Sequence, residues 1–229
     1  MSVPEIIFLV LEIIGAIAFS ISGASCAIKA RLDVFGVVFI GVITTVGGGI
    51  VRDIIIGHTP PRIFENYLIL GVAFGTSLIA FLVACVLRKR FDGISIKIDK
   101  INNIFDAIGL GAFSVIGTEI AFAEGVSSNP LLAILLGVLS GVGGGVFRDI
   151  LTASTPYIFK KHVYAIASIV GAVAYYIIRL YFQDIWLPSL VGMALVIVIR
   201  LLATRYRWSL PKAHVEMEYE PLFQHKKKN

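Results

Sequence analysis

The chain has 229 residues, of which 57% are hydrophobic and 15% are charged, and its net charge is +5 at pH 7. A water-soluble domain of this size needs more charge on its surface, so the composition indicates a membrane protein with several spans and excludes a soluble globular protein. No RNA-binding or DNA-binding motif accompanies the basic residues, so nucleic acid is not an expected partner.

Seven segments are apolar enough to cross a bilayer, since one helical crossing needs roughly 20 residues. The predicted spans are 5–27, 34–57, 66–87, 103–123, 130–152, 162–182 and 185–204. The first carries Glu5 and Glu12 and lacks the basic start of a signal peptide, so we interpret it as a retained span. The expected fold class is therefore an all-α membrane protein with seven transmembrane helices.

The basic residues predict the orientation in the membrane. Lys and Arg gather in the loops after spans one, three and five and in the tail after span seven, for example at Lys29, Arg88 and Lys160. The opposite loops offer Arg62 and little else. Because basic loops stay cytoplasmic, we expect an inner (plasma) membrane protein whose N-terminus lies outside and whose C-terminus is cytoplasmic.

A motif in the second span recurs in the fifth. "VGGGIVRDIIIGHTP" (residues 46–60) returns as "VGGGVFRDILTASTP" (residues 142–156), and "EIIGAIAFSISG" (12–23) returns as "DAIGLGAFSVIG" (106–117). The unit has three spans, an odd number, so the second copy enters the membrane from the opposite side.

The repeat predicts a division of the chain. Residues 5–88 form the first three-helix repeat, 103–183 form the second, inverted repeat, and 185–204 form a seventh helix. Residues 205–229 are expected to be a disordered cytoplasmic tail. Such architectures place the substrate path between the repeats.

Each repeat carries three consecutive glycines in its second span. They are Gly47, Gly48, Gly49, Gly143, Gly144 and Gly145. Each glycine costs about 1 kcal/mol relative to alanine in a helix, so the triplets predict a local break or kink that frees carbonyl oxygens for a cation. The alternative is close helix packing, for which small residues are also typical.

An Arg-Asp pair follows each triplet: Arg52 with Asp53, and Arg148 with Asp149. One interpretation is that these charges fix the helix ends and screen or gate the two mouths of a pore. The other is snorkelling and simple ion pairing near the membrane faces. Glu12 and Asp106 occupy equivalent positions in the first turns of their spans, where a carboxylate also suits the helix dipole.

Hydroxyl side chains mark a candidate path through the spans. The candidate pore-lining residues are Ser20, Ser22, Thr44, Thr45, Ser114, Thr118 and Ser140. Hydroxyls in membrane helices often only bond the preceding carbonyl, which is the alternative for about half of them. The chain has no P-loop, HExxH or nucleophile elbow, so we expect no enzyme and no cofactor; the metal site is unknown, with K⁺ binding only transiently.

This doubled GGGxxRD motif in inverted three-span units, with a seventh span, resembles the prokaryotic trimeric intracellular cation (TRIC) channel family. The resemblance implies a homotrimer in membrane lipid, with one pore per subunit that conducts K⁺ or other monovalent cations and with kinks at the glycines. The eukaryotic relatives bind phosphoinositide through a different motif, so lipid regulation is not transferred. The same bacterial family is also described as a possible glycine transporter, so the alternative is a secondary transporter of a small amino acid.

Overall fold

The computed structural model describes residues 3–65, 67–87, 95–160, 163–182 and 184–208. Seven of its helices are long and apolar enough to cross a membrane. They coincide with the predicted spans to within a few residues, apart from the fourth, which begins earlier than expected, at Ser95. Most of the predicted disordered tail, residues 209–229, lies outside the described residues.

The elements in chain order are α1 (Val3–Lys29), α2 (Val34–Ile55), the short 3-10 helix η1 (Arg62–Phe64), α3 (Tyr67–Leu87), α4 (Ser95–Ala123), α5 (Pro130–Leu151), α6 (Tyr157–Lys160), α7 (Val163–Tyr181) and α8 (Trp186–Arg205).

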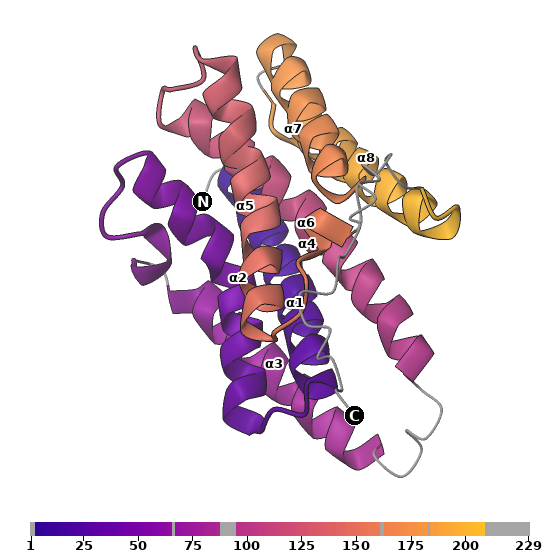
Figure 1. Cartoon of the computed structure of the whole chain (residues 1–229). Coiled ribbons are helices and arrows are strands. Elements are labelled where there is room, and N and C mark those ends of the chain that lie inside the picture. The colour runs from indigo at the N-terminus through magenta and orange to yellow at the C-terminus, as the bar shows by residue number, and fades with distance from the viewer. Residues whose placement is uncertain (1–2, 66, 88–94, 161–162, 183, 209–229) are drawn as a thin grey trace, which may run out of the picture.

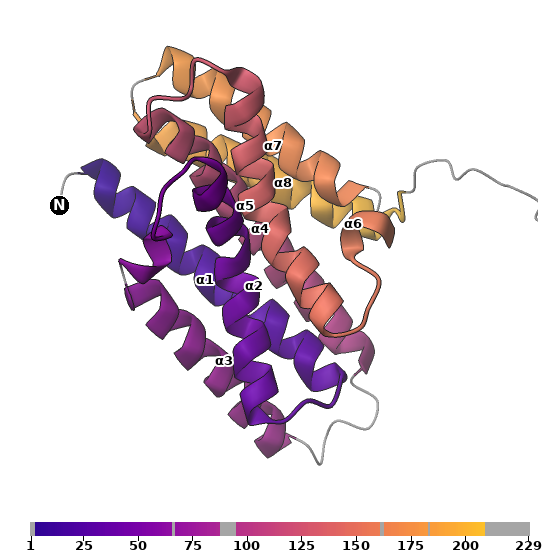
Figure 2. The same ribbon diagram turned by 60° about the vertical axis from the view of Figure 1, so that its left-hand side comes forward.

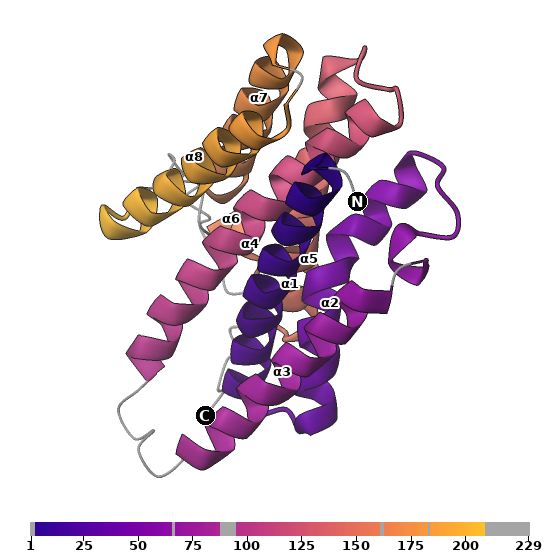
Figure 3. The ribbon, with the colours of Figure 1, turned by 180° about the vertical axis from the view of Figure 1, so that it is seen from behind.

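Four helices form the centre of the molecule. Helices α1, α2, α4 and α5 pack on one another, α3 packs against α1 and α2, and α7 and α8 pack against the side of α4 (Figures 1 and 2). The centre therefore lies between one flank built by α3 and an opposite flank built by α7 and α8. Helix α4 runs between α1 and α8 (Figure 3), and its span from Ile101 to Ala123 has the largest buried share of the seven spans.

The two second helices of the proposed repeats begin and end in the same way. Asp33 accepts a hydrogen bond from the backbone N–H of Gly36 at the start of α2, and Asn129 accepts one from Leu132 at the start of α5. Such side-chain caps satisfy backbone donors that the first turn leaves free. At the other end, the N–H that follows each helix donates to an arginine carbonyl, that of Arg52 or Arg148. The division into repeats stays a prediction, and these matched caps are consistent with it.

The hydrophobic core lies where the halves meet. A buried cluster joins Phe19 of α1 to Leu110, Phe113 and Ile116 of α4 and to Val142 of α5. Residues from the first and second predicted repeats thus share one core, so the halves pack as a single unit.

Candidate functional site

The glycine triplets lie where α2 and α5 touch backbone to backbone. A Cβ built on Gly48 would collide with the carbonyl oxygen of Ser140, and one on Gly144 would collide with that of Thr44. A Cβ on Gly143 would come within 2.9 Å of the Cα of Gly48. A side chain at these positions would force the two helices apart, so close packing requires glycine here.

The expected break at the triplets is corrected by the structure. Both α2 and α5 run through their three glycines as continuous helices. The contact between the triplets explains this, since the packed helices compensate for the weak propensity of glycine. No free carbonyls are needed to account for the motif, and a kink at the glycines stays a prediction.

The predicted hydroxyl residues are all buried, and their hydrogen bonds go partly to their own helix and partly to other helices. Thr44, Thr118 and Ser140 each donate to the carbonyl four residues earlier, which is the plain reading for hydroxyls in a membrane helix. Other contacts join helices: Ser20 with Thr45 at 2.9 Å, and the hydroxyls of Ser114 and Ser168 at 2.6 Å. The Thr45 hydroxyl also lies 3.4 Å from the carbonyl oxygen of Ala16, and the Ser22 hydroxyl accepts from Arg148.

In each Arg-Asp pair, the arginine donates to the aspartate that follows it, near the end of its helix. Arg52 donates to Asp53 Oδ1 through Nε at 2.8 Å and through Nη2 at 2.7 Å. Arg148 Nε donates to Asp149 Oδ1 at 2.8 Å. The other oxygen of each carboxylate accepts a backbone N–H from the following loop, from Arg62 at 3.0 Å for Asp53. For Asp149 the donor is Tyr157, at 2.8 Å. Each aspartate therefore anchors both its arginine and the loop beyond the helix.

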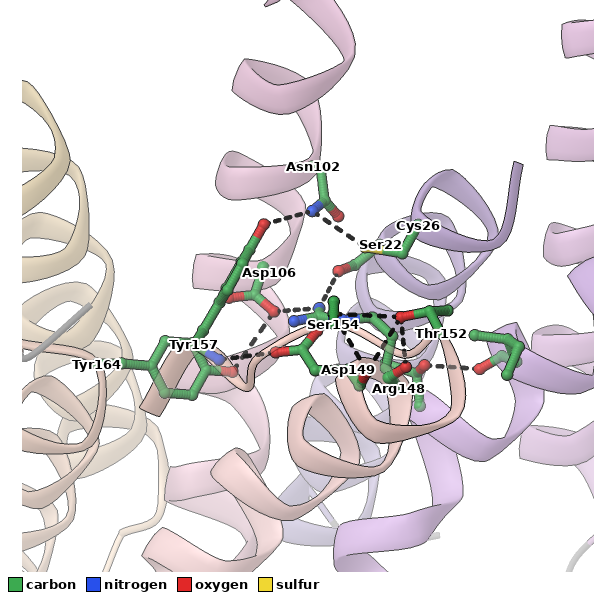
Figure 4. A network of polar contacts seen from close by, with 12 residues as sticks. Ser22, Cys26, Asn102, Asp106, Arg148, Asp149, Thr152, Ser154, Tyr157 and Tyr164 are labelled. Atoms are coloured by element: carbon green, nitrogen blue, oxygen red, sulfur yellow. Dashed lines mark hydrogen bonds and ion pairs between the residues drawn. The ribbon is translucent and has the colours of Figure 1, made fainter. Parts of the chain in front are cut away.

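At the second pair, a buried network joins five helices, and we call it the Arg148 network (Figure 4). Arg148 Nη1 donates to Asp106 Oδ1 at 2.6 Å and to the Ser22 hydroxyl at 2.5 Å. Arg200 Nη2 approaches Asp106 Oδ2 at 3.4 Å. The Tyr164 hydroxyl donates to Asp106 Oδ1 at 3.4 Å. One carboxylate thus holds two arginines away from water, and the negative charges of Asp106 and Asp149 balance the two positive charges of Arg148 and Arg200.

Sequence reasoning missed Arg200 and Tyr164. Arg200 is 1% exposed and its guanidinium lies 4.6 Å from the centre of the Tyr164 ring. A signal was present, since Arg200 is a charge inside the apolar seventh span, and such charges usually face a partner within the protein. Its partner could not be read from the sequence, because it lies on α4.

The first pair faces a cavity instead. A cavity of about 460 Å³, which we call the Arg52 cavity, is lined by Glu12, Thr45, Gly49, Arg52 and Asp53 among others. Further lining residues are Phe8, Val46, His58, Arg62, Ile63, Glu65, Ile69, Phe113, Ile116 and Glu124. Acidic side chains outnumber arginines on this wall, so its field favours cations.

Equivalent carboxylates therefore have different environments at the two ends. Asp106 is fully buried between two arginines, whereas Glu12 is partly exposed and lines the Arg52 cavity. The loop beyond the Arg52 cavity is held by an ion pair between Arg62 and Glu124. The Arg148 pair is therefore buried in its network, whereas the Arg52 pair lines a cavity.

A smaller cavity of about 250 Å³ lies beyond the Arg148 network, and we call it the Asp149 cavity. Its wall includes Cys26, Asn102, Asp149 and Tyr157. The Asn102 amide donates to the Tyr157 hydroxyl at 3.3 Å. Burial raises the pKa of Tyr157 to about 12, so this phenol stays protonated at neutral pH. Among the residues that the structure describes, no group of three or more His, Cys, Asp or Glu side chains is placed to hold a metal ion.

The chain matches known sequences over most of its length. The family model described as "Glycine transporter" matches residues 9–84 and 103–179. The UPF0126 inner membrane protein YadS of Escherichia coli (strain K12) is 37% identical over 206 residues, which is 88% of this chain and 93% of that protein. The UPF0126 membrane protein YvgT of Bacillus subtilis (strain 168) is 32% identical, over 91% of this chain and 97% of that protein.

Solved structures share the fold. A prokaryotic TRIC channel in 0.5 M KCl superposes with a TM-score of 0.79 at 33% identity, over 90% of this chain and 100% of that one. The TRIC trimeric intracellular cation channel orthologue from Rhodobacter sphaeroides gives a TM-score of 0.78 at 28% identity, over 88% and 99% of the two chains. The seven-helix multi-pass membrane fold is thus confirmed, and the chain belongs to the prokaryotic TRIC channel family, whose sequence model carries the description "Glycine transporter".

Proposed function

We propose that this protein is a monovalent cation channel, chiefly for K⁺, with a pore through each subunit between α1, α2, α4 and α5. The observation that supports this most is the pair of cavities that enter the four-helix centre from opposite ends, the Arg52 cavity and the Asp149 cavity. The likeness to solved TRIC cation channels supports the same function.

The Arg52 cavity is suited to gather cations. Glu12, Asp53, Glu65 and Glu124 contribute carboxylates to its wall. A cleft with one sign of charge and apolar walls concentrates ions of the opposite sign. The wall of this cavity also includes Thr45 and Gly49, which carry no charge. The hydroxyl of Thr45 is a neutral polar group, and groups of this kind can replace part of an ion's hydration shell.

The Arg148 network closes the other end in this conformation. The buried side chains of this network fill this end of the proposed path and are paired with one another, so conduction requires Arg148 to move away from the path. The role of Arg148 and Asp149 is then that of a gate, whereas Arg52 and Asp53 line an open mouth. A change in the contact between the triplets of α2 and α5 is a candidate for the motion, with or without a kink at the glycines.

We further propose a homotrimer in the inner membrane with the N-terminus outside. The trimer rests on the likeness to the trimeric channel orthologue, and the orientation rests on the placement of Lys and Arg in the loops. Light scattering on the purified protein in detergent tests the trimer, which a monomer mass would contradict. A reporter fused to either terminus tests the orientation.

The rival function is transport of a small zwitterion such as glycine. One observation favours it: the Arg52 cavity presents Arg52, which could bind a carboxylate, together with Glu12, which could bind an ammonium group. The description of the family model points the same way.

The experiment that tests the proposal is single-channel recording of the purified protein in planar bilayers under a KCl gradient. Discrete openings with a reversal potential near that of K⁺ support the channel. A silent bilayer together with saturable glycine uptake into proteoliposomes overturns it in favour of the transporter. Recording in NaCl and in KCl from the same preparation then tests the preference for K⁺.

A further inference from the structure

Two phenylalanines at equivalent positions of the predicted repeats stack in the centre of the molecule. Phe19 of α1 and Phe113 of α4 each stand in the shared sequence Ala-Phe-Ser. Their ring centroids lie 5.3 Å apart and their planes differ by 29°. Phe19 is fully buried, and Phe113 is 8% exposed where it lines the Arg52 cavity.

Each ring sits against a glycine of the other helix. A Cβ built on Gly109 of α4 would collide with the ring of Phe19. A Cβ on Gly15 of α1 would come within 3.0 Å of Cε2 of Phe113. Both glycines stand four residues before the phenylalanine of their own helix, so the arrangement is reciprocal. Each phenylalanine ring therefore packs on a glycine of the other helix in the same way, and the two contacts are related by the symmetry of the predicted repeat.

On helix α1, Phe19 lies between residues that line the two cavities. Along α1, Glu12 lines the Arg52 cavity, Ser22 bonds Arg148, and Cys26 lines the Asp149 cavity. Phe19 shares their helical stripe, since steps of seven, three and four residues return to one face. At about 1.5 Å of rise per residue, Phe19 is about 10 Å from Glu12 and about 10 Å from Cys26.

Helix α4 places Phe113 in the same layer from the opposite direction. Asp106 belongs to the Arg148 network and Ile116 lines the Arg52 cavity. Phe113 stands between them on the same stripe. The cluster around the two rings is apolar and includes Leu110 and Val142. The neighbouring hydroxyls of Ser20 and Ser114 are buried and already hydrogen-bonded, to Thr45 and Ser168.

We propose that Phe19 and Phe113 form a hydrophobic constriction that closes the path between the two cavities. The inference rests on the proposed channel function and adds a second barrier to the Arg148 network. An apolar constriction of this kind stops ions by excluding water rather than by charge. The ring of Phe19 lies 3.6 Å from the position of a Cβ on Gly144, so a shift of α5 at its glycine triplet would reach the ring directly.

Single-channel recording of four purified full-length variants in KCl tests the constriction. They are Phe19→Ala, Phe113→Ala, Phe113→Leu and the control Phe122→Ala. Phe122 is also on α4, and its ring centroid lies 5.5 Å from that of Tyr176 with the planes tilted by 42°, outside the walls of both cavities. We expect the two constriction alanines to raise the open probability about tenfold, which corresponds to about 1.4 kcal/mol in the opening equilibrium. Leucine should give a smaller rise, and the control none.

The outcomes separate this inference from the proposed function. If the wild type conducts and the folded constriction variants open no more often than it does, the constriction is wrong and the channel stands. If the wild type and all variants are silent, the channel function itself fails. A rise in the Phe122→Ala control equal to that of Phe113→Ala would also overturn the inference, since loss of any ring in the core would then be enough.

A second measurement does not depend on alanine variants that fold poorly. In a Cys26→Ser, Cys85→Ser background, Leu110→Cys places a thiol on α4 between Phe113 and Asp106, on the near side of the Arg148 network. Ag⁺ applied from the side of the Arg52 cavity should not modify this thiol while the channel is closed. When Phe113→Leu is added, whose side chain keeps most of the volume, Ag⁺ should reach the thiol and change the current several times faster. Equal rates in the two proteins would place the barrier elsewhere.

Discussion

Arg148 of α5 and Asp106 of α4 form an ion pair, with Nη1 and Oδ1 2.6 Å apart, in which both side chains are fully buried. The same carboxylate faces Arg200 of α8 through its other oxygen, at 3.4 Å. Asp106 therefore ties the seventh helix to the second half of the protein. Its equivalent in the first half, Glu12, lines the Arg52 cavity. The two equivalent carboxylates therefore differ: Asp106 forms buried ion pairs between helices, and Glu12 lines a cavity.

Replacing Asp106 should destabilise the protein strongly. The substitution Asp106→Asn leaves Arg148 and Arg200 buried with a single aspartate, Asp149, nearby. Loss of one partner in a buried ion pair costs about 3–5 kcal/mol because an uncompensated charge remains. Thermal or denaturant unfolding of the purified protein in detergent measures the change. The matched control is Glu12→Gln at the equivalent position, which should cost under about 1 kcal/mol; equal losses would refute the difference between the two ends.

Arg200 and Asp106 should be energetically coupled. Because both guanidinium groups share the Asp106 carboxylate, Arg200→Gln should cost less in an Asp106→Asn background than in the wild type. The double-mutant cycle should give a coupling of about 1–3 kcal/mol in the free energy of unfolding. The reference cycle pairs Arg200→Gln with Glu12→Gln and should be additive within about 0.5 kcal/mol. A coupling near zero in the first cycle would mean that the 3.4 Å approach carries no energy.

Glycines of the repeated motif should differ in how much their substitution by alanine changes the free energy of unfolding. A Cβ on Gly144 would collide with the carbonyl oxygen of Thr44, whereas a Cβ on Gly49 would meet only the Arg52 guanidinium, at 3.6 Å or more. Gly144→Ala should therefore cost about 1–3 kcal/mol through overpacking. Gly49→Ala should be neutral or stabilise by up to about 1 kcal/mol, because alanine favours the helix. The free energy of unfolding of both variants, measured in the same detergent, tests this difference. Equal changes in the two variants would contradict the role of Gly144 in packing.

The carboxylate of Glu12 should raise the conductance of the proposed channel at low salt. Neutralising it in Glu12→Gln removes a unit charge from the wall of the Arg52 cavity. A charge about 8 Å from a permeating ion contributes on the order of 0.5 kcal/mol in water, so conductance should fall about twofold. The difference should vanish at about 1 M salt, where the screening length is about 3 Å.

The control for this experiment is Asp184→Asn, an exposed carboxylate between α7 and α8 outside both cavities. It should leave the conductance unchanged at every salt concentration. A fall that persists at high salt in Glu12→Gln would indicate altered packing rather than a lost surface potential.

The amino-acid sequence alone determined the seven spans, their ends to within a few residues except at the start of α4, and the family. Span length and hydropathy are local properties that the thickness of the bilayer dictates. The repeated motif can be recognised from the residues alone, without knowing how the two copies pack. Glu12 and Asp106 could be matched in this way, and so could the Arg-Asp pairs.

Tertiary structure decided what the matched residues do. The glycines of α2 and α5 were expected to break their helices, but both helices are continuous, and Gly48, Gly143 and Gly144 pack against the backbone of the facing helix. Whether a carboxylate is sealed, like Asp106, or lines a cavity, like Glu12, depends on whether an arginine from another helix reaches it. Arg200 and the stacking of Phe19 on Phe113 also depend on contacts between distant helices. The burial of a side chain and its ion-pair partners depend on how the helices assemble. Helix periodicity shows which residues share a face of one helix, but it does not show which residue of another helix that face will contact.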